Sequence, residues 1–137
     1  MRQVLYISES TVSMSDDDLQ ELLEVCRKNN KEHHITGVLI YIYNRFIQCV
    51  EGEPNEIEQL ITNVRKDKRN KYFILLRDME IIDRTFVDWS MGFINYENDK
   101  KILKKEYFEI SSLKDLEHIE YLDKQIFSLM SGFYKSY

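Results

Sequence analysis

The side chains best suited to chemistry are an amide and a phenol in two short apolar segments. Gln48 lies in the middle of the run Phe46-Ile47-Gln48-Cys49-Val50. Because strand side chains alternate between faces, Gln48 shares a side with Phe46 and Val50. An amide buried without hydrogen bonds costs about 1–3 kcal/mol, so a protein group, water or a ligand must satisfy it. Tyr6 lies in an apolar segment near the start, and its hydroxyl can both donate and accept.

The first elements that must position these groups are a strand over residues 4–7 and a helix that Ser15 and Asp18 open with a capping-box pattern. The apolar stripe of this helix, continued by four residues, reaches Asn30. Asn30 is therefore expected to turn its amide toward the sheet, whereas Arg27 and Lys28 are expected to face water. The stripe consists of Leu19, Leu22, Leu23 and Cys26.

The following segments predict a hairpin, a second helix, two more strands and a last helix. Asn44-Arg45 separates two strands rich in β-branched and aromatic residues, 35–43 and 46–50. Pro54 suits the first turn of a helix that ends near Lys66. Strands are predicted over 72–76, with an extension as far as 82, and over 87–94. An amphipathic helix from Ser112 carries Leu113, Leu116, Ile119, Ile126, Met130 and Phe133.

This order predicts an α+β fold, a ferredoxin-like βαββαβ sandwich with an extra strand and a C-terminal amphipathic helical extension. We expect residues 1–97 to form the ligand-binding domain and 98–137 the helical cap. In this topology the first and third strands are central neighbours, so Tyr6, Gln48 and Asn30 can meet between the sheet and two helices that cover one face. A few polar groups in an apolar cleft are typical of a ligand site.

Composition and charge narrow the classes of function. The 137 residues suffice for one domain, and the net charge of −5 argues against a duplex nucleic-acid binder. The basic residues between Arg65 and Arg77 could hold a phosphate-bearing ligand or could form a solvated loop. The start of the chain lacks a signal-peptide pattern and the longest apolar run, 38–43, is too short to span a bilayer, so we expect a cytoplasmic protein without a membrane partner.

Metal binding and enzyme catalysis are not predicted. Cys26 and Cys49 have no metal-ligand spacing and do not suggest a disulfide framework. The histidines, His33, His34 and His118, lie in a loop and a late helix, where the sequence supports no pairing with a serine or cysteine nucleophile.

Six motifs in order make the region from Val4 to about Phe93 resemble the BLUF domains, blue-light sensors that bind FAD. Tyr6 and Asn30 are 24 positions apart, and Tyr6 and Gln48 are 42 apart, as in that family. The motifs are Leu-Tyr-Ile-Ser (5–8), Arg-Lys-Asn-Asn (27–30), Ile-Thr-Gly-Val-Leu (35–39), Phe-Ile-Gln-Cys-Val-Glu-Gly (46–52), Asp-Lys-Arg (67–69) and Trp-Ser-Met (89–91).

The resemblance implies a blue-light photoreceptor that binds FAD non-covalently, with FMN or riboflavin as alternatives. It implies that Tyr6 donates an electron and a proton to the excited flavin and that Gln48 lies between the phenol and the ring. Trp89 and Met91 would belong to the strand that changes between signalling states, with one of them beside the glutamine. The residues implied to bind the flavin are Asn30, Asn29, Arg69, Asp67, Leu22, Cys26, Leu39 and Phe46. Cys26 and Asn70 depart from the Ser and His that are common in the family at these positions.

Two alternative functions remain open at this point, as does the way in which a light signal would leave the domain. A light-insensitive ferredoxin-like interaction module would give a colourless protein, and a small hydrolase on the same fold is a further alternative. No effector segment is recognisable after the sensor, so we expect the signal to pass to an unidentified downstream protein, and we expect a homo-oligomer. The last helix, with Tyr121, Phe127, Phe133 and Tyr134 beyond its core stripe, is expected to pack on the outer sheet face that carries Ile47 and Cys49, or on a second subunit.

Overall fold

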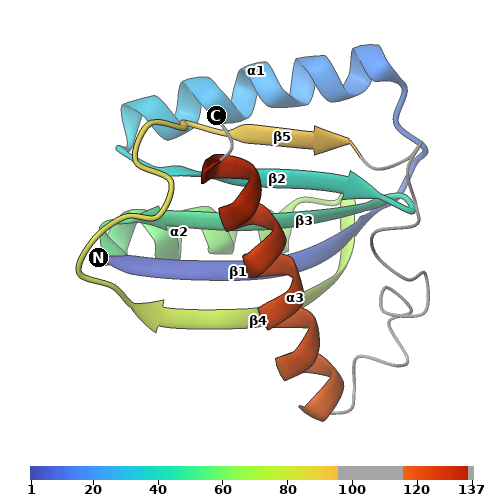
Figure 1. Ribbon diagram of the computed structural model, residues 1–137. Coiled ribbons are helices and arrows are strands. Elements are labelled where there is room, and N and C mark those ends of the chain that lie inside the picture. Colours follow the sequence, from blue (N-terminus) through green and yellow to red (C-terminus); the bar gives the residue numbers. More distant parts are fainter. Residues whose placement is uncertain (96–115, 136–137) are drawn as a thin grey trace.

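The structure is a computed structural model that describes residues 1–95 and 116–135, and within the last helix the side chains of 123–132, 134 and 135. Its strands and helices follow the predicted order (Figure 1). They are β1 (Arg2–Ser10), α1 (Asp16–Glu32), β2 (Thr36–Ile42), β3 (Arg45–Gly52), α2 (Pro54–Lys66), β4 (Asn70–Glu80), β5 (Gly92–Asn95) and α3 (Leu116–Lys135).

The five strands form one sheet in the order β4-β1-β3-β2-β5. The four strands of the ferredoxin-like unit are antiparallel to their neighbours, and β5 is the extra strand, which pairs parallel to the edge of β2. β1 and β3 are central neighbours, and their register places Tyr6 opposite Gln48. The predicted fold class and this central pairing are therefore confirmed.

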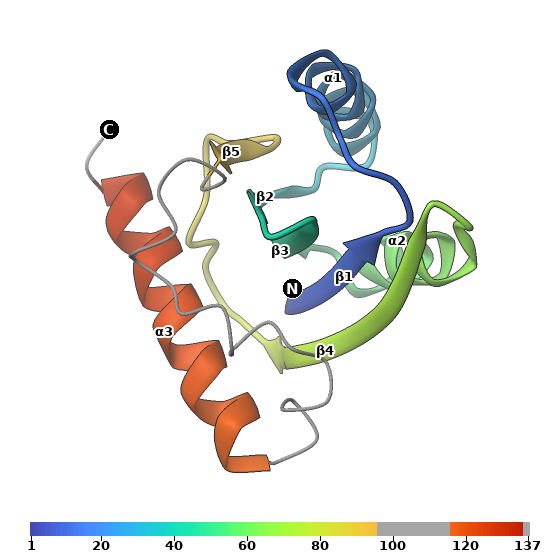
Figure 2. The same ribbon diagram turned by 90° about the vertical axis from the view of Figure 1, so that its right-hand side faces the viewer.

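The sheet has a helix-covered face and an outer face, each with its own apolar cluster. Figure 2 shows α1 and α2 on one side of the strands and α3 on the other. On the first side, Leu19 and Leu23 of α1 and Ile57 and Ile61 of α2 pack with Tyr6 and its neighbours. On the outer side, Ile126 and Met130 of α3 are fully buried against Leu5, Ile7, Val38, Ile40, Ile42, Ile47 and Cys49.

Local sequence signals account for the ends of several elements. The Ser15 hydroxyl accepts the Asp18 amide at 3.1 Å, and the Asp18 carboxylate accepts the Ser15 amide at 3.0 Å, so the capping box is confirmed. Pro54 occupies the first turn of α2. The β2–β3 turn was predicted one residue late, because Tyr43 and Asn44, both with positive φ, are its central residues and β3 begins at Arg45. Such φ values match the twist of a two-residue hairpin.

One other boundary differs from expectation. The strand predicted over 87–94 is wrong in its first half, since β5 contains only Gly92–Asn95 and residues 81–91 form an irregular segment. A turn explains the late start, because the Trp89 amide donates to the Phe86 carbonyl at 3.5 Å. The Trp89 indole then lies over Gly92, where a Cβ atom would come within 2.3 Å of the ring. The described part of the last helix is Leu116–Lys135, so the predicted start at Ser112 is not tested. The proposed domain division after residue 97 lies outside the described part, as do Ser112 and Leu113. The structure also does not describe the side chains of Leu116, Ile119, Tyr121 and Phe133.

Candidate functional site

Tyr6 and Gln48 form a buried hydrogen-bonded pair at the centre of the sheet. The Tyr6 hydroxyl donates to Oε1 of Gln48, and the two side chains are 1% and 8% exposed. Burial, with a smaller contribution from Cys26, raises the pKa of the Tyr6 phenol above its ordinary value of about 10. The phenol is therefore neutral at physiological pH, and its O–H group donates the hydrogen bond to the amide oxygen.

Met91 lies on the other side of the Gln48 amide. Nε2 of Gln48 is 3.5 Å from the Met91 sulfur, and Met91 is 2% exposed. Trp89, two residues earlier, belongs instead to the outer cluster, where its ring packs edge-on against Tyr134 of α3 at 4.8 Å. The structure thus places Met91, and not Trp89, beside Gln48, a choice that the sequence left open. Both residues lie before β5 rather than within a strand.

Asn30 connects α1 with the segment before β5. Its side chain is 1% exposed, and Nδ2 donates to the carbonyl of Ser90 at 2.6 Å. Nε of Arg27 donates to the next carbonyl, that of Met91, at 2.9 Å. The inward orientation of Asn30 is confirmed, but Arg27 does not simply face water, because the end of α1 lies close enough for it to reach the Met91 backbone.

Apolar side chains surround the pair on the helix-covered face. Leu39 and Phe46 are 3% and 8% exposed and belong to the same cluster as Tyr6. The Phe73 ring stacks on the Tyr6 ring with centroids 4.8 Å apart, and the Arg65 guanidinium lies 4.2 Å from the centroid of Phe73. Further apolar residues pack against this cluster and are only partly buried: Met14, Leu22, Leu60, Val64, Phe73 and Phe93.

The remaining predicted binding residues lie toward the surface rather than against the buried pair. Asn29 is exposed, and Arg69, whose side chain is 77% exposed, forms a bidentate ion pair with Asp67. Hydrogen bonding from Arg69 lowers the pKa of Asp67. Cys26 is half-buried, and burial raises the pKa of its thiol against the opposing effect of Arg69 and Arg27.

The basic run from Arg65 to Arg77 does not act as one surface. Arg65 stacks on Phe73 and Arg69 pairs with Asp67, whereas Arg77 contacts Asp123 of α3 on the outer face. Any phosphate contact on the helix-covered face would therefore come from the first part of this run.

Sequence reasoning missed Phe73 and the role of Ser90. Simple alternation could not place Phe73 beside Tyr6, because the β1–β4 register shifts between Leu5 and Tyr6 and again after Ile7, and Tyr72 has a positive φ. The hydrogen bond to Ser90 uses its backbone carbonyl, for which no side-chain type gives a signal.

Comparison with known proteins agrees with this geometry. A family described as "BLUF: Sensors of blue-light using FAD" matches residues 1–92, so the chain belongs to the BLUF family. It is a flavin-binding blue-light photoreceptor domain. In the described part of the chain, no helix has the length and apolar character to cross a membrane. The same part has no cluster of three His, Cys, Asp or Glu side chains placed to hold a metal ion.

Relatives and solved structures support the assignment. Photoactivated adenylate cyclase subunit beta of Euglena longa is 29% identical over 87 residues, which cover 63% of this chain but only 10% of that protein. A bacterial light-regulated adenylyl cyclase matches with a TM-score of 0.66 and 31% identity over 93% of this chain and 36% of the other. The dark state of BlrB, a BLUF protein, matches with a TM-score of 0.71 and 24% identity over 91% and 93%, which supports the fold alone. The chain thus spans about a tenth of the length of the Euglena relative.

Proposed function

We propose that this domain binds FAD non-covalently and responds to blue light by a change in hydrogen bonding at Gln48. The observation that carries the proposal is the buried Tyr6–Gln48 pair, which lies on the helix-covered face within an apolar cluster whose edge residues are only partly buried. A bound flavin would supply light absorption and an electron acceptor in the excited state. The protein supplies the groups that respond to them.

Tyr6 is proposed to donate an electron and then a proton. Its phenol is neutral and oxidisable, and Phe73 and Gln48 fix its ring and hydroxyl. The proton has a direct route, because the hydroxyl already donates to the Gln48 carbonyl oxygen.

Gln48 is proposed to carry the switch, because an amide has a carbonyl acceptor and an NH₂ donor on one flexible side chain. In the structure its carbonyl accepts from Tyr6 while its NH₂ group faces the Met91 sulfur. Rotation or tautomerisation after proton transfer would exchange these contacts. A new hydrogen bond to a flavin carbonyl would stabilise the excited state of the flavin more than its ground state. The absorption would then shift slightly to the red.

The proposed binding residues suit both ends of the cofactor. Leu22, Leu39 and Phe46 offer apolar contacts to the ring, with Cys26 at the half-buried position beside them. Asn30 and Asn29 offer amides to its polar edge. Arg69, with Asp67 as its anchor, provides an exposed cation suited to a ring carbonyl or to phosphate.

The signal is proposed to pass to a protein partner, with Trp89 and Met91 as the residues that change contact. The two lie on opposite sides of the sheet, against α3 and Gln48 respectively. The cyclases among the relatives are light-regulated or photoactivated proteins by name, which supports coupling of such domains to effectors.

The test is a visible absorption spectrum of purified protein before, during and after blue illumination, with the extracted cofactor identified by chromatography. The wild type should be yellow, contain FAD and show a reversible red shift. Tyr6→Phe and Gln48→Ala should keep the colour and lose the shift. Tyr72→Phe and Gln59→Ala change the same residue types at exposed positions and should behave as wild type. A normal photocycle in Tyr6→Phe or Gln48→Ala would refute the assigned roles.

A further inference from the structure

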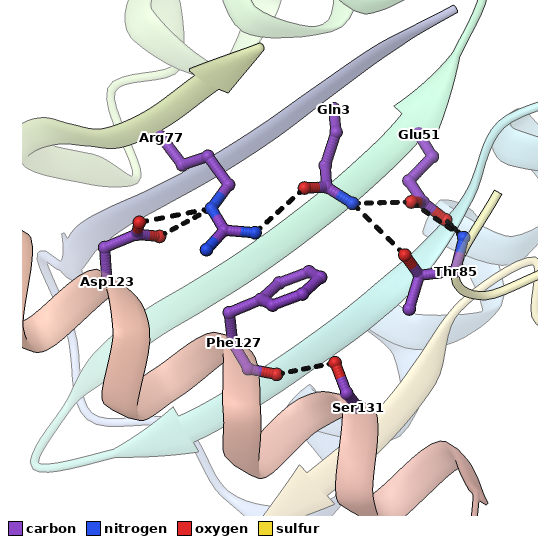
Figure 3. Close-up of polar contacts among 7 residues, drawn as sticks. All are labelled: Gln3, Glu51, Arg77, Thr85, Asp123, Phe127 and Ser131. Carbon is purple, nitrogen blue, oxygen red and sulfur yellow. Dashed lines mark hydrogen bonds and ion pairs between the residues drawn. The ribbon is translucent and has the colours of Figure 1, made fainter. Parts of the chain in front are cut away.

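A row of polar side chains lies on the outer face of the sheet, beneath α3 (Figure 3). Gln3 of β1 and Glu51 of β3 are directly opposite each other in the register and are 2% and 0% exposed. Alternation from Leu5 and Cys49, which belong to the outer cluster, puts both on the outer face. A carboxylate buried so completely needs several hydrogen-bond donors.

The polar contacts form an unbroken chain from α3 to the segment before β5. The Asp123 carboxylate of α3 accepts Nε of Arg77 at 2.9 and 3.2 Å, and Nη1 of Arg77 donates to Oε1 of Gln3 at 3.1 Å. Nε2 of Gln3 donates to Glu51 at 2.7 Å. The Glu51 carboxylate also accepts the backbone amides of Thr85, at 2.9 and 3.0 Å, and Phe86, at 2.8 Å.

The segment held by Glu51 ends at the candidate flavin site. Beyond Phe86, the Trp89 carbonyl accepts the Gly37 amide at 2.9 Å and the Ser90 carbonyl accepts from Asn30. Met91 then contacts Gln48. The segment from Thr85 to Met91 therefore has one end fixed on the outer face and the other beside the photoactive pair.

Gln3 can take only one orientation in this series of polar contacts. Its carbonyl oxygen faces a guanidinium and its NH₂ group faces a carboxylate, so the reversed amide would oppose donor to donor and acceptor to acceptor. Displacement of Arg77 removes one of the two contacts that fix this orientation. The Gln3 donor to the fully buried Glu51 is then held in place by the carboxylate alone.

We propose that Gln3 and Glu51 are positioning residues, which make the placement of Met91 beside Gln48 depend on the attachment of α3 through Asp123 and Arg77. The coupling is a property of the protein in the dark and does not require the proposed photochemistry. It runs beside an aromatic contact of the same two parts, in which Phe86 packs edge-on against Phe127 and Tyr134.

The experiment is amide hydrogen exchange by NMR on the full chain in the dark, together with the methyl resonance of Met91. Asp123→Asn and Gln3→Met should each speed exchange of the Thr85 and Phe86 amides about tenfold and move the Met91 resonance, because a lost charged hydrogen bond allows local opening. The double variant should exceed the larger single effect by less than about twofold, because both changes interrupt the same chain of contacts.

Asp78→Asn is the matched control. It removes another carboxylate–arginine pair between β4 and β1, with Arg2 at 2.8 and 2.7 Å, which makes no hydrogen bond with the Gln3 side chain. It should leave both signals unchanged. The proposal would be overturned if Asp78→Asn matched Asp123→Asn, or if the effects of Asp123→Asn and Gln3→Met multiplied.

Arg77→Lys separates geometry from charge and keeps the test usable if a charge-removing variant folds poorly. A lysine retains the positive charge, but its single ammonium cannot reproduce the guanidinium fork that contacts Asp123 and Gln3 together. It should therefore behave as Asp123→Asn. Wild-type exchange at Thr85 and Phe86 in Arg77→Lys would also overturn the proposal.

Discussion

The amide nitrogen of Gln48 lies 3.5 Å from the sulfur of Met91, while the carbonyl oxygen of the same amide accepts from Tyr6. The two contacts differ greatly in strength, because a thioether sulfur is a weak acceptor whereas a phenol hydroxyl is a good donor. The amide is thus held firmly at its oxygen and loosely at its nitrogen. This asymmetry is useful in a side chain proposed to reorient.

Met91→Leu tests the weak contact directly. Leucine keeps the apolar volume at a 2% exposed site, so stability should fall by less than about 1.5 kcal/mol. The amide NH₂ loses its sulfur partner, and we expect the reversible red shift to persist with an altered rate of dark recovery, followed by absorption after a blue pulse. A recovery rate equal to that of wild type would mean that the sulfur contact has no part in the photocycle.

Gly92→Ala should displace the only tryptophan of the chain. An added Cβ would lie 2.3 Å from the Trp89 ring, which is closer than real contacts allow, so the indole must leave its place against Tyr134. We expect a red-shifted tryptophan emission and a stability loss of about 1–3 kcal/mol. Gly132→Ala, where nothing lies within 4 Å of the added atom, should leave the emission unchanged and preserve or raise stability. Unchanged emission in Gly92→Ala would contradict the packing.

Much of the fold and the centre of the site could be predicted because local signals and topology agree there. The alternation around Gln48, the capping box at Ser15 and the order of elements are sufficient to place Tyr6 opposite Gln48. The segment from Thr85 to Met91 could not be predicted, because it has no periodicity and is fixed by contacts with residues 34 to 82 positions away, among them Glu51 and Gln3.

The polar chain beneath α3 was missed for a related reason. Gln3, Glu51 and Arg77 appear in the sequence as ordinary polar residues near strand ends. In the structure Gln3 and Glu51 are buried, and Arg77 is half-buried against Asp123 of α3. A single sequence does not reveal which face a distant helix covers. Phe73 escaped detection because two register shifts in the β1–β4 ladder interrupt the alternation.

The Arg2–Asp78 pair should give stability a specific dependence on pH. Hydrogen bonds from Arg2 lower the pKa of Asp78 in the folded state, whereas an unfolded aspartate has a pKa of about 3.9. The stabilisation is therefore present above pH about 4 and is lost as the pH falls through the folded-state pKa. The Asp78 side chain is 36% exposed, so the contribution should not exceed about 1 kcal/mol.

Urea denaturation of wild type and Asp78→Asn measures this contribution. The difference in unfolding free energy should be constant between pH about 5 and 7 and should shrink in more acidic solution. Arg2→Gln should show the same trend, because either change removes the pair. A difference that grows toward acid would contradict the assignment.

Ile126→Asp should detach α3 from the sheet. Ile126 is fully buried against the outer cluster, and a carboxylate there would have no charged partner among its apolar neighbours. Release of the helix uncovers Leu5, Ile40 and Ile47, so we expect binding of a hydrophobic dye and association on size-exclusion chromatography. Gln125→Asp, at an exposed position one residue away, should do neither. A monodisperse Ile126→Asp protein that binds no dye would show that α3 does not protect this face.

β5 is a short parallel strand at one edge of the sheet formed by the described residues, with four residues paired to β2. So few ladder bonds can open and close many times while the central strands remain intact. We expect proteolysis or a competing peptide to act on β5 more readily than on β4, the longer strand at the opposite edge. A sensor that must alter its surface without unfolding thus has its most easily released strand directly after Met91.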